Sequence, residues 1–539
     1  MSVAVRSDAA ETFDYVIVGG GSAGCVLAAR LSERADRRVL SLEAGPDDHN
    51  IFVRMPGTIV RVLGTERTWV YSTDSEPGAK GRRLHVPQGR TLGGGSSVNA
   101  MVYMRGDRAD YDGWRDGGCA GWGYDDVLPF FKKSEGNARL ADGRHGTDGP
   151  LRVTDTPYRH PLSAAFVRAA QESGARYNHD FNGDSQLGAG FYQITAYDGE
   201  RGSTARAFLA PALRRKNLTV RTGALATQIL FTGNRATGVV YLDQQARPVE
   251  VAATCEVVLA AGALATPKLL MLSGIGPADH LKEHGIEMVQ PLAGVGGNYH
   301  DHLEVPIIGR TREPISMHGA DRGLAALRHG LQWLLFRTGL LTSNLVESGG
   351  FWDLDGDGRA DVQFHVLPVI VGDVDREPLP GHGISLNPCG LAPKSRGRVR
   401  LRSSVPSEPA QFQGNYLSND EDVDVLVDAV RLARRILKSP SLARLVETEL
   451  LPGADIADDR AALAEHVRSF AKTVYHPCGT CRMGTDPSAV VDPQLRVRGI
   501  DGLRVADASI MPTLVRGNTN APAIMIAERA ADFIAQSHN

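Results

Sequence analysis

Four residues near the start of the chain have the types and spacing that hold a dinucleotide. Gly19, Gly21 and Gly24 form the pattern G-x-G-x-x-G, and Glu43 follows 19 residues after the last glycine. The glycines permit a tight turn, a close approach of the backbone to a pyrophosphate and close packing of helix on strand. A carboxylate at this distance can accept hydrogen bonds from an adenosine ribose.

The surrounding sequence predicts the elements that would position these residues. A β-branched apolar run at residues 15–18 predicts a buried strand, residues 22–34 a helix, and residues 38–42 a second strand. Ser22 and Ala23 begin the helix, whose free N–H groups would face the phosphates. The order strand, helix, strand therefore predicts the first unit of a Rossmann-like α/β fold.

The bulk properties indicate a globular protein of more than one domain. The chain has 539 residues, of which 42% are hydrophobic and 22% charged. A net charge of −3, with Lys and Arg spread along the chain, argues against nucleic-acid binding. The first fifteen residues lack the apolar core of a signal peptide, and six cysteines do not make a disulfide scaffold. We therefore expect a cytoplasmic protein.

Further strands and helices are predicted along the chain. Residues 217–260 alternate apolar and polar positions, which is typical of strands joined by tight turns. Ser418 and Glu421 have the spacing of a capping box, with Ser418 as the cap of a long helix. Residues 46–88 are expected to be irregular. Further strands are expected near residues 361–371, 398–403 and 503–506, and helices at residues 268–273 and 521–536.

The chain has one complete dinucleotide fingerprint. The run at residues 93–95 lacks a third glycine at the proper place, and the run at residues 294–299 ends in the wrong residue. One fingerprint indicates one dinucleotide, and by itself it leaves FAD and NAD open.

Four further stretches resemble the signatures of the glucose-methanol-choline (GMC) family of FAD-dependent oxidoreductases. They are GRTLGGGSSVNAMVYMRG (89–106), GALATPKLLMLSGIG (262–276), YHPCGTCRMG (475–484) and VADAS through GNTNAP (505–522). Within the family the chain resembles bacterial alcohol dehydrogenases of the alkane-oxidation type and choline dehydrogenases. The resemblance implies FAD as the cofactor.

The same resemblance implies two domains. A Rossmann-like FAD-binding domain would comprise residues 1–155, 203–312 and 470–539. A substrate domain built on an antiparallel sheet would comprise residues 156–202 and 313–469.

The resemblance also singles out two catalytic residues. His476 matches the position of the active-site base, although without the motif it would be one of 16 histidines and more readily structural. Asn518 matches the second catalytic position, where an amide can hydrogen-bond a developing alkoxide. Asn518 could instead cap the C-terminal helix, but Asn520 is the expected cap.

The remaining site residues are carried over in the same way. Some family members attach FAD covalently through a histidine just before the motif asparagine, and because Val98 stands there we expect dissociable FAD. The helix that begins near Thr519 and Asn520 is expected to point at the flavin. The residues expected along the flavin, its pyrophosphate and the adenine are Arg90, Gly93, Gly95, Asn99, Met101, Ala226, Asp507 and Ala508.

Three other patterns are set aside. Cys478 and Cys481 form C-x-x-C, but the second cysteine is ordinary at this place in the family. Residues 353–358 imitate a calcium loop without its final glutamate, which favours a polar hairpin turn. His300 and His302 have no further ligands at zinc spacing. We expect no metal.

Residues 323–341 combine apolar side chains with the basic residues Arg328, His329 and Arg337. Such an amphipathic helix could rest on a membrane surface or cover a sheet inside the protein. Both interpretations stay open, and a peripheral membrane location is one of them.

The expected reaction is oxidation of a primary alcohol to the aldehyde, with hydride passing to FAD, the proton to His476 and the electrons to a quinone-type acceptor. Three alternatives stay open: an oxidase that uses oxygen, a choline dehydrogenase, and a hydroxynitrile lyase with FAD that does not turn over. Choline would require an aromatic or carboxylate cage for its ammonium group, and Glu347 is the candidate.

Overall fold

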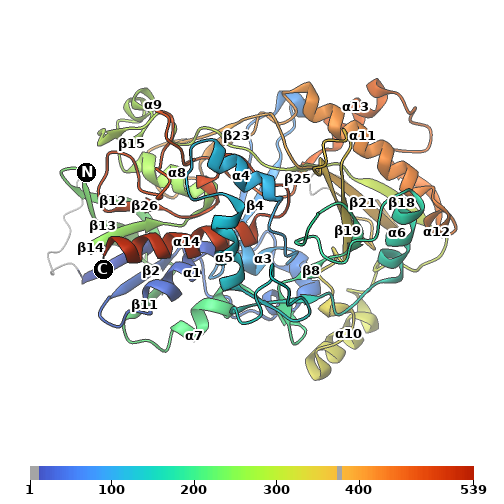
Figure 1. Cartoon of the computed structure of the whole chain (residues 1–539), viewed down its shortest axis with the longest axis horizontal. Coiled ribbons are helices and arrows are strands. Elements are labelled where there is room, and N and C mark those ends of the chain that lie inside the picture. Colours follow the sequence, from blue (N-terminus) through green and yellow to red (C-terminus); the bar gives the residue numbers. More distant parts are fainter. Residues whose placement is uncertain (1–10, 373–378, 539) are drawn as a thin grey trace.

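The computed structural model describes residues 11–372 and 379–538 of the chain. Two large sheets lie side by side, with helices packed around them (Figure 1). Residues 1–10, which contain most of the N-terminal stretch considered above, lie outside the described part. Among the described residues no helix is both long and apolar enough to cross a membrane.

The first sheet is mixed, and its parallel part has the predicted Rossmann-like arrangement. In order across the sheet its strands are β11 (Leu218–Thr222), β2 (Val39–Glu43), β1 (Glu11–Val18), β14 (Pro248–Leu259), β13 (Arg235–Leu242) and β12 (Leu225–Thr232). The first four are parallel neighbours, and β12, β13 and β14 form an antiparallel meander. The meander was predicted to include residues 218–222 as well, but these form β11, which pairs in parallel with β2. β26 (Leu503–Val505) pairs in parallel with the last residues of β14.

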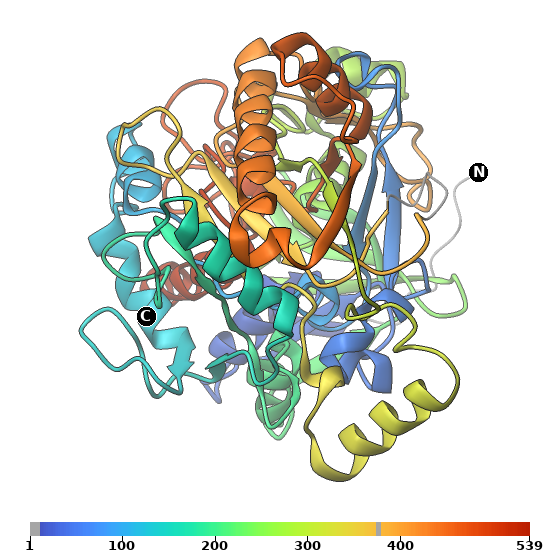
Figure 2. The same ribbon diagram turned by 90° about the vertical axis from the view of Figure 1, so that its right-hand side faces the viewer.

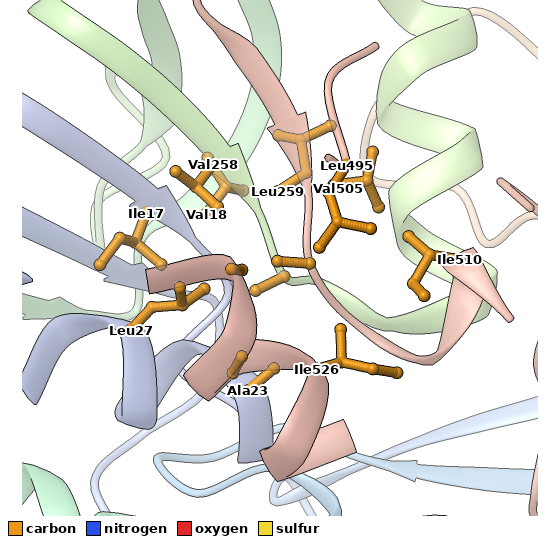
Figure 3. Packing of buried hydrophobic residues seen from close by; sticks show 14 of the residues in the cluster. Ile17, Val18, Ala23, Leu27, Val258, Leu259, Leu495, Val505, Ile510 and Ile526 are labelled. Atoms are coloured by element: carbon orange, nitrogen blue, oxygen red, sulfur yellow. The ribbon is translucent and has the colours of Figure 1, made fainter. Parts of the chain in front are cut away.

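Buried apolar side chains pack the first strand and the first helix of the chain together. Figure 3 shows Ile17 of β1, Leu27 of α1 (Ser22–Leu31) and Ile526 of α14 (Asn520–Ser537) among the side chains that meet there. Gly24 lets α1 approach β1, because a Cβ at this position would lie 1.7 Å from the carbonyl oxygen of Gly19.

The second sheet is antiparallel, as predicted for the substrate domain. Its main strands, in order, are β24 (Val446–Leu451), β18 (Ile307–Thr311), β21 (Gly383–Gly390), β20 (Val362–Leu367), β19 (Ser348–Trp352) and β7 (Gly188–Phe191). The short β17 (Leu303–Glu304) joins β21 to β25 (Lys472–Thr473). α6 (Pro161–Glu172) and α11 (Asp420–Leu437) pack on this sheet (Figure 2).

The predicted domain boundaries stay a prediction. The chain passes between the two sheets several times. β17 and β18 come from the segment 203–312 and β25 from the segment 470–539, yet all three pair in the second sheet. The two sheets therefore share the segments that carry the site.

Residues 46–88 are more regular than the sequence indicates. They contain a short α2 (Ile51–Arg54), the 3-10 turn η1 (Pro56–Arg61) and a hairpin of β3 (Thr68–Ser72) and β4 (His85–Gly89). The prediction of an irregular connection was wrong, because the hairpin strands are short and partly exposed and lack a continuous apolar run.

Three predicted helix boundaries were also wrong. α8 (Gly262–Leu272) begins six residues before the predicted start and contains Pro267. The proline cannot donate to the Ala263 carbonyl one turn earlier, but the Thr480 hydroxyl does, at 2.6 Å. α11 is capped by Asn419, whose side chain accepts from the Glu421 N–H, and not by the neighbouring serine. α1 ends three residues early, where the chain turns towards β2.

Candidate active site

A cavity of about 430 Å³ lies at the segments that connect the two sheets. The first turns of α1, α8 and α14 contribute to its wall, as do strands β17, β20, β21 and β25 of the second sheet. Most of the predicted site residues line it, namely Gly21, Ser22, Ala23, Gly95, Asn99, Met101, His476, Asp507, Ala508, Asn518, Thr519 and Asn520.

Space for a ligand is left open at the glycine turn. A Cβ on Gly21 would have its nearest neighbour, the Gly94 Cα, 3.8 Å away, and a Cβ on Gly95 would meet the Ser22 hydroxyl at 3.9 Å. Bare backbone therefore borders the cavity beside the N-terminus of α1, where free N–H groups favour a phosphate. The residues present fit a pyrophosphate-bearing cofactor.

Glu43 ends β2 and holds the glycine turn through its backbone. Its two carboxylate oxygens accept hydrogen bonds from the Gly20 N–H, at 2.9 Å, and from the Gly45 N–H, at 2.8 Å. Burial raises the pKa of Glu43 to about 7, against the opposing effect of these hydrogen bonds. The ribose contact stays a prediction.

The other predicted residues are not part of the described lining. Gly19 and Gly93 have positive φ angles of 104° and 82°, which glycine tolerates, and so they shape the turns. The Arg90 guanidinium lies 4.5 Å from the centre of the Trp69 ring, which itself lines the cavity. Ala226 lies on β12.

Asn520 is not the helix cap, so this prediction was wrong. Thr519 takes the cap position, and Asn520 is the first residue of α14. Its side-chain oxygen accepts a hydrogen bond from the Ser22 hydroxyl at 2.9 Å. This contact competes with capping and ties the start of α14 to the start of α1, so that two helix N-termini face one cavity.

Asp507 binds neighbouring elements instead of projecting freely. Its carboxylate accepts from the Gly262 N–H at 2.8 Å and the Thr266 hydroxyl at 2.7 Å, and from the Ser509 N–H at 2.8 Å. These bonds fix the first turns of α8 against the chain beyond β26. Ala508 follows it on the cavity wall.

His476 is held at the cavity by its backbone and its ring. Its N–H donates to Asp301 at 2.7 Å, and the Tyr416 hydroxyl donates to the same carboxylate at 3.0 Å. The preceding residue, Tyr475, has a φ of 68°, so the loop turns sharply there. The structure thus fixes the position of this imidazole from two sides.

The hydrogen bonds of a second histidine select the tautomer of His476. The Nε2 of His302 lies 3.1 Å from the Leu391 carbonyl oxygen, which can only accept, so this nitrogen carries the proton. A neutral His302 then has a lone pair on Nδ1, and His476 donates to it from its own Nδ1 at 3.0 Å. The Nε2 of His476 is left with its lone pair.

Both imidazoles are neutral near pH 7. Burial lowers the pKa of His302 to about 3. Burial also lowers the pKa of His476 well below its ordinary value, and the imidazoles of His302 and His365 lower it further. His476 therefore stands ready to accept a proton.

Asn518 lies beside the free nitrogen of His476. Its amide Nδ2 is 3.4 Å from the His476 Nε2, and its oxygen accepts from the Gln363 amide at 3.1 Å. The Gln363 contact orients the Asn518 amide so that its N–H groups face the histidine. The two predicted catalytic residues are thus brought together, 42 residues apart in sequence.

The sequence reasoning missed several polar residues of the cavity, and four of them form a cluster. They are Glu304, His365, Asn387 and Lys472, and all four line the cavity. The spacing of His302 and Glu304 at the start of β17 was a usable signal, since side chains two apart in an extended chain share a face. No local pattern connects the other three.

Glu347, the candidate for an ammonium contact, is fully buried away from the described lining of the cavity. Its carboxylate accepts from the Ser343 hydroxyl and from the His160 N–H, each at 2.6 Å. That prediction was wrong because the residue before β19 turns towards α6.

The patterns set aside above have structural roles. Residues 353–361 join β19 to β20 as a polar hairpin, as predicted, with the Gly356 and Gly358 N–H groups donating to Asp353. Cys478 and Cys481 are buried free thiols, and burial raises the pKa of each well above its ordinary value.

Comparison with known proteins shows the family to which this chain belongs. The GMC oxidoreductase family matches residues 13–304 with its N-terminal region and residues 393–527 with its C-terminal region. The chain belongs to the GMC oxidoreductase family, and it is an FAD-dependent oxidoreductase that acts on alcohols.

Relatives extend over nearly the whole chain. An alcohol dehydrogenase [acceptor] of Pseudomonas putida is 45% identical, covering 97% of this chain and 95% of the relative. The mitochondrial choline dehydrogenase of Homo sapiens is 44% identical, covering 98% and 90%. Among solved structures, pyridoxine 4-oxidase from Mesorbium loti has a TM-score of 0.90 at 33% identity, covering 98% of this chain and all of that one. Formate oxidase of Aspergillus oryzae has a TM-score of 0.92 at 26% identity, covering 98% and 99%.

Proposed function

We propose that this protein oxidises a primary alcohol to the aldehyde, with His476 as the base. The observation that carries the proposal is the pairing of the His476 lone pair on Nε2 with the Asn518 amide at one point of the cavity wall. FAD, when bound, supplies the hydride acceptor.

The protein's own residues handle the proton and the oxygen. The substrate hydroxyl donates its proton to the His476 Nε2, and the Asn518 N–H stabilises the negative charge that develops on the oxygen. His302 keeps the accepting nitrogen unprotonated beforehand. A base in this position contributes roughly 10²–10⁴-fold to the rate.

We also propose that FAD is held without a covalent bond. Val98, at the end of α3 (Gly95–Val98), lines the cavity and has no nucleophilic atom. The pyrophosphate would lie against Gly21 and Ser22, at the N-terminus of α1. Acid precipitation of the holoprotein should release the flavin to the supernatant, and flavin in the pellet would contradict this.

The electron acceptor is proposed to be a quinone reached at a membrane surface. Helix α10 (Gly323–Phe336) projects from the body in both views (Figures 1 and 2). It is anchored by the buried Trp333, whose indole N–H donates to the Gly199 carbonyl at 2.7 Å. Its exposed apolar side chains are Leu324, Leu327, Leu331, Leu334, Leu335 and Phe336, which we call the apolar patch.

The apolar patch is connected through η1 to the lining of the cavity. The turn at residues 340–342 that follows α10 packs on η1, and Arg61 of η1 pairs with Asp321 at 3.6 Å. Val60 of η1 is 63% exposed and also lines the cavity. The exposed Arg322 and Arg328 would suit anionic headgroups. An apolar quinone could thus reach the cavity from lipid.

The reaction class is tested by anaerobic mixing with a panel of alcohols while the flavin absorbance is followed. Bleaching that persists in air and reverses with a quinone supports the proposal. Rapid reoxidation by air with peroxide would indicate an oxidase, and no bleaching by any alcohol would favour the lyase alternative.

A further inference from the structure

A polar cluster in the wall of the cavity is not used by the proposed chemistry. It consists of Glu304 on β17, His365 on β20, Asn387 on β21 and Lys472 on β25. Four neighbouring strands of the second sheet therefore bring these side chains to the same cavity as His476.

Glu304 is the centre of this cluster. Its Oε2 lies 3.1 Å from the His365 Nδ1, its Oε1 accepts from the Asn387 amide at 2.9 Å, and the Lys472 ammonium is 3.4 Å away. Burial would raise the pKa of Glu304, but Lys472 and His365 outweigh it and hold this pKa below its usual value. The carboxylate is therefore charged, and its charge is balanced by the lysine.

Two atoms of the cluster have no hydrogen-bond partner among the described residues. They are the Nε2 of His365 and the Oδ1 of Asn387, on side chains that are only 7% and 2% exposed. In the tautomer of His365 that donates to the carboxylate from Nδ1, the Nε2 is an acceptor, and the Asn387 oxygen is an acceptor too. Buried polar atoms without partners are costly, which points to a ligand group that donates to them.

The charges also decide what the cavity rejects. An unpaired carboxylate would attract a cationic substrate, whereas here a quaternary ammonium group would approach the Lys472 ammonium beside Glu304. Like charges in a cavity poorly reached by water repel strongly. A quaternary ammonium has no N–H to offer the two acceptors.

We infer that the cluster selects neutral alcohols that carry a second hydrogen-bond donor, received by His365 and Asn387, and that Lys472 disfavours quaternary ammonium alcohols such as choline. This inference rests on the proposed function and narrows its substrate class. The four residues would be specificity-determining, while His476 and Asn518 carry the reaction.

A pair of substrates with the same shape tests whether Lys472 disfavours a quaternary ammonium group. Choline and 3,3-dimethylbutan-1-ol differ in a nitrogen cation against a carbon. The wild-type holoenzyme should have a kcat/KM at least tenfold higher for the neutral alcohol. This ratio needs no variant, and a wild type that prefers choline would overturn the inference.

The variant Lys472→Met should shift the ratio at least tenfold towards choline, because it uncovers the charge of Glu304. The double variant Lys472→Met/Glu304→Gln should lose that gain. Lys216→Met, at an exposed lysine before β11, is the matched control and should keep the wild-type ratio. An unchanged ratio in Lys472→Met, measured on protein that retains FAD, would contradict the role of the lysine.

A comparison of diols with alkanols tests the two acceptor atoms, on His365 and Asn387. Across a series of α,ω-diols, at least one should have a higher kcat/KM than the 1-alkanol of equal length, and His365→Phe should abolish this preference. If no diol has a higher kcat/KM than the 1-alkanol of equal length, the role of His365 and Asn387 as acceptors is overturned. Flavin reduction by alcohols with no such preferences would refute this inference alone, whereas no reduction by any alcohol would refute the proposed function as well.

Discussion

The Nδ1 of His302 and the Nδ1 of His476 lie 3.0 Å apart, and only one of them carries the proton between them. Since the Leu391 carbonyl requires the other nitrogen of His302 to be protonated, the shared proton belongs to His476. A backbone carbonyl thus determines, through one imidazole, which nitrogen of the next imidazole faces the cavity.

Replacing His302 by phenylalanine should lower the rate of flavin reduction about 10- to 100-fold, because His476 loses its acceptor and the other tautomer becomes accessible. His302→Gln should recover part of the rate, since its amide oxygen can accept from the same Nδ1. Nitrogen NMR of His476 would report the tautomer directly. Equal rates in the wild type and His302→Phe would remove His302 from this positioning role.

The pH dependence of kcat/KM should reflect the lowered pKa of His476. A base works only when unprotonated, so activity is kept as the pH falls from neutral and is lost only on passing the lowered pKa. The acid limb should therefore lie below pH ~6.5, the ordinary value for histidine. A half-maximal point at or above that value, with FAD still bound, would contradict this account.

Glu43→Ala should weaken FAD retention about tenfold or more, since two buried backbone N–H groups of the glycine turn lose their hydrogen-bond acceptor. Retention is measured as the ratio of flavin to protein after dialysis. Glu33→Ala, at a half-exposed residue beside α1, is the control and should retain flavin like the wild type. Equal retention in Glu43→Ala and the control would count against this role.

The wild type should float with vesicles that contain anionic lipid, and Leu327→Glu/Leu335→Glu should remain at the bottom of the gradient. Each glutamate places a charge on the apolar patch, where burial in lipid would be costly. Val405→Glu changes an exposed apolar residue outside the patch and should float like the wild type. Failure of the wild type to float would refute the membrane proposal.

The sequence predicted those parts of the site that depend on local pattern. The glycine turn, the strand before Glu43 and the residues of the two C-terminal signatures all depend on neighbours in the chain. The strands within residues 217–260 were also predictable, because alternation of apolar and polar residues reports directly on a half-buried strand. The parallel pairing of β11 with β2, which removes β11 from the meander, was not.

Contacts between distant segments were not predictable in the same way. Asn520 was expected to cap its own helix, yet Ser22, 498 residues away, takes its side-chain oxygen. Lys472 and Glu304 form a pair only because β17 and β25 are neighbours in the second sheet. The amphipathic pattern of α10 was clear, but whether its apolar side faced protein or solvent required the structure.

The most direct measurement of the proposed mechanism is rapid anaerobic mixing of an alcohol with the wild type and with His476→Ala, both loaded with FAD. Primary alcohols should bleach the wild-type flavin. The variant should still bind yellow FAD, but its flavin should bleach at about one hundredth of the wild-type rate or below. Bleaching of the variant at the wild-type rate would show that His476 is not the base.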